Sequence, residues 1–180
     1  MELIQFFSYV VIFIAIMLII YAIFYNKIKT QILKINSAES EIDESLRTKY
    51  DIINKLIAEI LQVDKNNKNF KNVDKLKDEE LSSFEFERKL YDLESQIYTI
   101  KNDNNKLQKS KTMNELWYEI ININTKIKAE EKYYNENTTK YNKLVTTFPS
   151  KLIAIILRLE EKTYFDGKDM YDDNIKDFKI

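Results

Sequence analysis

The chain has 180 residues, with 28 Lys+Arg against 29 Asp+Glu, a formal net charge of -1 at pH 7, and neither His nor Cys. Without Cys there are no disulfides, thiolate metal sites or cysteine nucleophiles, and without His the commonest proton-transfer side chain is missing. The balanced charge argues against nucleic-acid binding, and the single glycine, Gly167, cannot build a phosphate-binding loop. The composition therefore predicts a protein that is not an enzyme and carries no cofactor or metal.

The N-terminal segment carries the strongest signal. No charged residue occurs from Leu3 to Tyr25, and the second half of this stretch is almost wholly apolar. About 20 apolar residues cross the hydrocarbon core of a bilayer as a helix. A cleaved signal peptide would start with positive charge and have a shorter apolar core, whereas this segment starts with Glu2. Residues 1–25 are therefore predicted to be a transmembrane anchor.

Lysines on one side of the anchor set its predicted orientation. No Lys or Arg precedes the apolar segment, and Lys27, Lys29 and Lys34 follow it. Because positive residues flank the cytoplasmic end of a span, the N-terminus is expected outside and residues 26–180 in the cytoplasm.

Beyond the anchor, apolar residues recur at steps of three and four, which is the pattern of an amphipathic helix. The first series begins at Ile28 and ends at Ile60, with Lys49 in one of its gaps. No Pro or Gly occurs in residues 26–63, so we expect the anchor to continue into this helix without a break. The Asn- and Lys-rich residues 65–69 then predict a loop.

A second helix is predicted over residues 86–107, after the acidic residues 78–80, which favour a helix start. Residues 102–111 are polar and predict a turn. The third helix, residues 113–148, has the most regular pattern, with the 3.5-residue period of a coiled-coil seam.

Pro149 ends the third helix, since the residue before a proline is pushed out of helical geometry. Ser150 is predicted to cap a short helix over residues 151–160. The predicted fold is therefore all-α: the anchor continues into an antiparallel up-down-up bundle over residues 26–162, followed by an acidic tail at 163–180.

In this bundle the turn at residues 102–111 lies at the membrane, where basic side chains are attracted to anionic lipid. A general abundance of Lys in the loops explains the pattern equally well. The predicted membrane-surface residues are Lys27, Lys29, Lys34, Lys101, Lys106, Lys109 and Lys111.

Polar residues on the seam of the third helix are predicted to form a buried network with the first helix. Such residues fix helix register at some cost in stability, and a binding site inside the bundle is the alternative. The predicted network contains Arg47, Tyr50, Asp51, Tyr134, Asn135, Asn137, Tyr141 and Asn142.

The corner after the third helix and its apolar block are predicted to lie at the end of the bundle far from the membrane. The block either folds back on the bundle or receives a partner helix. The candidate partner surface contains Phe148, Pro149, Leu152, Ile153, Ile155 and Ile156.

The acidic tail is a poor match to a calcium loop, because its acids lack the required spacing around Gly167. It is predicted to be a solvated segment. Its acids near the glycine are Asp166, Asp169, Asp172 and Asp173.

Three stretches of the sequence carry a recognisable pattern. Residues 47–57 are similar to Arg-x-x-Tyr-Asp-Leu-Ile, residues 133–154 to Tyr-Tyr-Asn…Tyr-Asn…Phe-Pro-Ser-Asn-Leu-Ile-Ala, and Tyr164-Phe165 to a closing Tyr-Phe. In these stretches the chain resembles the LemA family of bacterial membrane-anchored helical proteins. Asn54-Lys55 departs from the family's Pro-Asn, and Asn124 stands where we expect a Glu.

The resemblance implies a helical bundle on one anchor, a short external N-terminus and no established biochemical activity. We therefore expect a single-span protein of a bacterial cytoplasmic membrane that acts as an adaptor or scaffold, in contact with the lipid bilayer and a protein partner. A self-associating protein that organises the membrane is the alternative, and a small-molecule or metal-binding bundle is the weakest hypothesis.

Overall fold

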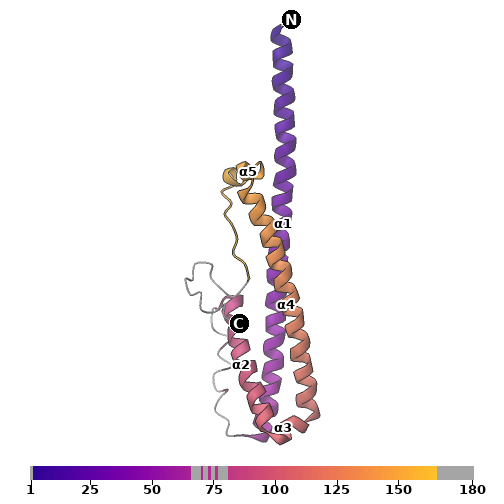
Figure 1. The fold of residues 1–180 in the computed structure, drawn as a ribbon, viewed down its shortest axis with the longest axis vertical. Helices are drawn as coiled ribbons and strands as arrows, with labels where there is room; N and C mark the ends of the chain where they lie inside the picture. Colours follow the sequence, from indigo (N-terminus) through magenta and orange to yellow (C-terminus); the bar gives the residue numbers. More distant parts are fainter. Residues whose placement is uncertain (1, 66–69, 71–72, 74–75, 77–80, 166–180) are drawn as a thin grey trace. The chain divides into compact units, whose positions relative to one another are not determined.

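A computed structural model describes residues 2–65, 70, 73, 76 and 81–165 of the chain. No strand occurs among these residues, so the predicted all-α class is confirmed. The helices in the described part are, in chain order (Figure 1), α1 Glu2–Val63, α2 Ser83–Asp103, α3 Asn105–Lys109, α4 Lys111–Thr146 and α5 Ser150–Ile156.

The first helix, α1, is one uninterrupted element of 62 residues, as the absence of Pro and Gly predicts. Its side chains are exposed from Glu2 to Ile23, and this part is the one described segment long and apolar enough to cross a membrane. Burial begins at Ile28 and follows the predicted series. The buried members are Ile28, Ile35, Ala38, Ile42, Leu46, Ile53, Leu56 and Ile60.

Side-chain caps, rather than glycines, set the start of α2 and the turn after it. The Ser82 hydroxyl accepts from the Glu85 N–H at 3.3 Å, and the Glu85 carboxylate accepts from the Ser82 N–H at 3.0 Å, which completes a capping box. These bonds to Ser82 lower the pKa of Glu85. Within the predicted turn, the Asn104 side chain caps α3 by accepting from the N–H groups of Lys106 and Leu107. The acidic residues 78–80 lie outside the described residues.

The last helix, α5, differs from its prediction at both ends. Ser150 is its first residue rather than its cap, and its hydroxyl donates to the Thr147 carbonyl at 3.0 Å. The helix ends at Ile156 instead of residue 160 because Arg158 takes a left-handed conformation, with φ 52°. The Leu159 N–H then donates to the Ala154 carbonyl at 2.9 Å, as in a Schellman motif.

The chain divides into two compact units, which we describe separately. Unit 1 contains residues 1–37 and 133–180, and unit 2 contains residues 38–132. The helices α1 and α4 each contribute a part to both units.

Within unit 2, α2 runs parallel to α1. Near the start of α2, Ser83 donates to Asp43, and near its middle Glu94 pairs with Lys49, so residue numbers rise together along the two helices. Residues 64–82 connect the helices, and the Val73 carbonyl accepts from the Tyr50 hydroxyl at 3.1 Å, well back along α1. The predicted up-down-up order is therefore wrong, because α2 begins beside Asp43 and not beside the end of α1.

The α4 part of unit 2 is antiparallel to α2. Asn124 bonds to Glu94, while the Trp117 ring lies against Tyr98 with 5.6 Å between centroids. Because α2 is parallel to α1, the turn between α2 and α4 lies at the end of unit 2 where α1 also ends. The prediction that this turn faces the membrane depended on an antiparallel α2 and loses its basis for Lys101, Lys106, Lys109 and Lys111.

The core of unit 1 joins the base of the apolar segment to the end of the chain. Its buried cluster brings together α1, α4 and α5, and the side chains of Phe24, Ile32, Leu157 and Leu159 pack against it. The buried members are Ile28, Ile35, Tyr141, Val145, Ile153 and Ala154.

Candidate functional site

Two asparagines on α4 hold an extended C-terminal segment in unit 1. The Asn142 amide donates to the Lys162 carbonyl at 2.8 Å and accepts from the Lys162 N–H at 2.9 Å. Asn135 makes the same pair of bonds with Phe165, at 2.9 Å and 2.6 Å. Each amide therefore binds both main-chain groups of one residue, as a neighbouring β-strand would. We call this arrangement the asparagine clamp.

The spacing of the clamp follows from helix and strand geometry. Asn135 and Asn142 are one heptad apart, which is about 10.5 Å along a helix. Lys162 and Phe165 are three residues apart, which is about 10 Å along an extended chain. The two repeats match, so the segment can run antiparallel to α4 and meet both amides.

Two tyrosines add to the clamp. The Tyr141 hydroxyl donates to the Glu160 carbonyl at 2.9 Å, and burial raises the pKa of Tyr141. The Tyr134 hydroxyl lies 3.4 Å from the Thr163 carbonyl, and its ring meets the Phe165 ring edge to face. These groups satisfy main-chain atoms that would otherwise need water.

The residues of the predicted polar network bond to groups other than those predicted. The α4 residues Tyr134, Asn135, Tyr141 and Asn142 bond to the C-terminal segment, and buried Asn137 donates to the Tyr133 carbonyl of its own helix at 2.7 Å. The predicted α1 members belong to unit 2. There Tyr50 is buried with its ring against Phe86, while Arg47 and Asp51 are exposed.

Arg47 and Asp51 line an open cleft of unit 2 with a volume of about 490 Å³. Asp43 and Ser83 form another part of its wall, and Ser83 donates to the Asp43 carboxylate. The cleft presents a guanidinium and carboxylates beside the apolar side chains of Leu76, Leu81 and Phe86, so its lining is part polar and part apolar.

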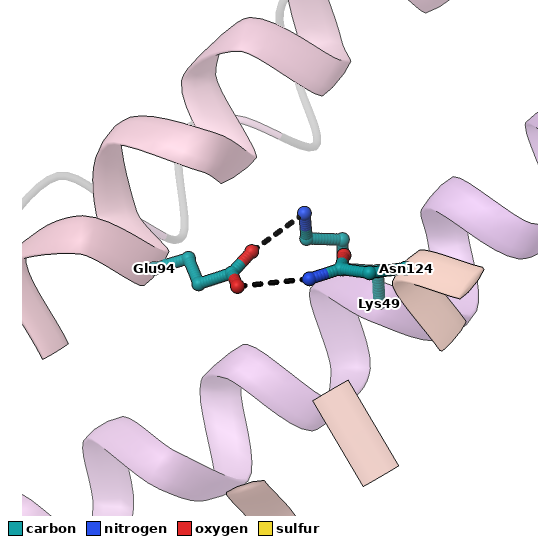
Figure 2. Close-up of polar contacts among 3 residues, drawn as sticks. All are labelled: Lys49, Glu94 and Asn124. Atoms are coloured by element: carbon teal, nitrogen blue, oxygen red, sulfur yellow. Dashed lines mark hydrogen bonds and ion pairs between the residues drawn. The ribbon is translucent and has the colours of Figure 1, made fainter. Parts of the chain in front are cut away.

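A buried ion pair lies inside unit 2 (Figure 2). The Lys49 ammonium, on a residue only 3% exposed, is 2.8 Å from one Glu94 carboxylate oxygen, and the Asn124 amide donates to the other oxygen at 2.8 Å. The three residues come from α1, α2 and α4. The burial of Lys49 was not predicted, and its position in a gap of the apolar series is the one sequence signal for it. No signal in the sequence identifies Glu94 as its partner.

A second carboxyl group of unit 2, that of Glu131, has a raised pKa. Burial, followed by a hydrogen bond to Glu87, raises the pKa of Glu131 to about 8, against the opposing effect of Lys128 and Lys49. The raised pKa favours the protonated form of the Glu131 carboxyl at neutral pH. Among the described residues no group of acidic side chains is suited to hold a metal ion, and Asp166, Asp169, Asp172 and Asp173 lie outside them.

The predicted partner surface divides into a buried and an exposed face. Ile153 is buried with Ala154 in the cluster that contains Ile28, whereas Pro149 is partly buried and four members of the predicted surface are exposed. The prediction placed this surface at the end far from the membrane. The structure instead packs it at the base of the apolar segment, because α4 returns along α1. The exposed members are Phe148, Leu152, Ile155 and Ile156.

Aromatic and basic side chains surround this base of the apolar segment. The rings of Tyr21 and Tyr25 stack with 5.9 Å between centroids. The Lys27 ammonium is 5.4 Å from the centre of the Phe24 ring, and the Lys29 ammonium is 5.7 Å from that of Tyr25. Aromatic and basic residues in this order are typical of the boundary between a membrane and water.

A family model with the description LemA family matches residues 38–176. The match covers most of the chain, including all of unit 2, and confirms the resemblance found in the sequence. No curated protein and no solved structure matches the chain.

Proposed function

The chain belongs to the LemA family, and we propose that it is a non-enzymatic scaffold anchored in a bacterial cytoplasmic membrane by residues 2–25 of α1. Residues 26–180 lie on the cytoplasmic side. The exposure of every described side chain from Glu2 to Ile23 carries this proposal.

The apolar segment suits lipid in both composition and length. From Leu3 to Phe24 the helix is about 33 Å long, close to the roughly 30 Å thickness of a hydrocarbon core. Apolar area left in water costs about 25 cal/mol per Å², and the described parts of the chain leave this surface uncovered. The lysines after Tyr25, with none before it, support a cytoplasmic location for the rest of the chain.

The interior of the two units supports a structural rather than catalytic role. The Lys49 ammonium is paired with Glu94 and almost completely buried, so it does not face the surrounding solution. The amides of Asn135 and Asn142 are occupied by main-chain groups. These polar side chains hold helices and the C-terminal segment in place, as a scaffold requires.

The absence of Cys makes a direct test of the anchor possible. We expect a Glu2→Cys variant to react with a membrane-impermeant maleimide in intact cells, and a Ser37→Cys variant to react only after permeabilisation. Both variants should remain in the membrane after alkaline carbonate extraction. Labelling of Ser37→Cys in intact cells would reverse the orientation, and release by carbonate would rule out the anchor.

Exposed aromatic residues in unit 2 favour self-association as the second candidate function. Tyr91 and Tyr98 are exposed one heptad apart on α2, and Tyr118 is exposed on α4. We expect the mass of the detergent-solubilised protein to rise with concentration and to fall to that of one copy in Tyr91→Arg. Gln96→Arg, at another exposed α2 position, is the matched control. A concentration-independent mass in the wild type would exclude this candidate.

A further inference from the structure

The helix α5 and the residues just before it form a small apolar surface. Phe148 is 77% exposed, and the exposed fractions of Leu152, Ile155 and Ile156 are 52%, 62% and 69%. The opposite face is anchored, because Ile153 and Ala154 are almost completely buried. The exposed residues therefore belong to a rigidly attached element and not to a loose end.

The position of this surface in unit 1 indicates what covers it. The buried face of α5 shares a cluster with Ile28, and Phe24 packs against the same cluster. Phe24 is the last apolar residue of the segment, and Ile28 is one helical turn further, about 6 Å along the axis. This distance is comparable to the depth, about 5–10 Å, to which a helix lying in the membrane surface buries its apolar face in the headgroup and upper acyl region.

The charges around the surface match the same environment. Within residues 148–157 the only charged side chain is Lys151, which is exposed, and exposed Arg158 follows directly. Lys27 and Lys29 lie at the same level on α1, over aromatic rings. An apolar face with a basic border is typical of helices that lie in the surface of an anionic bilayer.

We propose that the exposed face of α5, with Phe148, inserts into the lipid headgroup and upper acyl region of the leaflet in which α1 ends. This inference rests on the proposed membrane anchor and adds a second membrane contact to it. The chain then holds the membrane through a spanning helix and through an interfacial element that is distant in sequence but adjacent in unit 1.

The test uses full-length single-cysteine variants in vesicles of phosphatidylcholine and phosphatidylglycerol. An environment-sensitive fluorophore is attached at Ile156→Cys, at Val11→Cys in the apolar segment, and at exposed Gln96→Cys as the control. We expect the Ile156 probe to emit at shorter wavelength than the Gln96 probe. A spin label near the lipid headgroup should quench it more strongly than a label deep in the acyl chains, and the Val11 probe should show the reverse.

The three probes separate the two proposals. Quenching at Val11 with a water-like signal at Ile156 would overturn insertion of α5 and leave the anchor intact. Water-like signals at both positions would overturn both proposals. An Ile156 probe that is shielded from water but not quenched by either lipid label would overturn lipid insertion in favour of a contact between copies of the chain.

A second variant tests the apolar face itself. The change Ile155→Ser with Ile156→Ser affects exposed residues, so unit 1 should keep its fold. With the fluorophore at Phe148→Cys, we expect these changes to shift the emission toward that of water and to reduce headgroup-label quenching several-fold. Unchanged emission and quenching would overturn the proposal.

Discussion

Removing the Asn142 side chain should release the C-terminal segment from α4. The change Asn142→Ala deletes both hydrogen bonds to Lys162, of 2.8 Å and 2.9 Å. A hydrogen bond contributes about 1 kcal/mol net, so the two together stabilise the clamped segment by about 2 kcal/mol. Because 1.4 kcal/mol is a factor of ten in an equilibrium constant, the open segment should become roughly 30-fold more populated.

Limited trypsin digestion of the detergent-solubilised protein measures this opening. Trypsin attacks the Lys162 carbonyl, and in the clamp that carbonyl accepts a hydrogen bond from the Asn142 amide. Cleavage therefore requires the segment to leave α4. When opening and closing are fast relative to cleavage, the initial rate at Lys162 follows the open population and should rise roughly 30-fold.

Two comparisons make the result specific to the clamp. Asn122→Ala changes an exposed asparagine on the same helix and should leave the rate at Lys162 unaltered. Cleavage after Arg88 on α2 reports general unfolding and should not change in Asn142→Ala. An equal rate at Lys162 in the Asn142 and Asn122 variants would refute the reasoning, because it would mean that the amide bonds do not hold the segment.

Three further predictions concern stability, measured by thermal unfolding of the solubilised protein followed by circular dichroism. The pKa of Glu131 is about 8 in the folded chain against an ordinary 4.5, so the folded state holds a proton that the unfolded state releases between these values. The free energy of unfolding should therefore fall as pH rises from 4.5 to 8, by about 1–2 kcal/mol for this half-exposed group. Glu131→Gln should remove that part of the fall. An equal pH dependence of stability in the wild type and the variant would contradict this prediction. Lys49→Met removes the ammonium partner of the Glu94 carboxylate and should destabilise unit 2 by about 3 kcal/mol, with much of the loss recovered when Glu94→Gln is added. Arg158→Gly removes the cost of a left-handed non-glycine residue and should stabilise the end of α5 by about 0.5–1 kcal/mol, whereas a loss of stability would show that the arginine side chain matters more.

The faces of the long helices could be predicted from the sequence, because periodicity is a local property. Steps of three and four place one stripe of side chains on one side of a helix, whatever that helix packs against. Every seam position of α4 from Met113 to Ile127 is buried in the structure. The seam pattern fails at Phe148, which is exposed, because α4 ends at Thr146.

The direction of α2 could not be predicted in the same way, because periodicity gives a face and not a direction. The choice of an antiparallel helix assumed a short connection after α1. Residues 64–82 could span roughly 60 Å when extended, about twice the length of α2, so a return along α1 was always possible. Because α2 begins beside Asp43, α4 runs antiparallel to α1 in unit 2. Within unit 1, α5 packs against Ile28 at the base of the apolar segment and not at the far end of the predicted bundle.

The asparagine clamp explains what the family-like residues of α4 do. A helix-based interpretation assigned Asn135 and Asn142 to contacts between helices, because heptad spacing is the signature of a helical seam. The same spacing also equals the length of three residues of extended chain. The likeness to the family includes Tyr164-Phe165, which lies in the segment that the two asparagines bind. The two parts of the pattern, distant in sequence, are thus the two sides of one contact. The strength of that contact, and not a helix register, is what the Asn142 experiment measures.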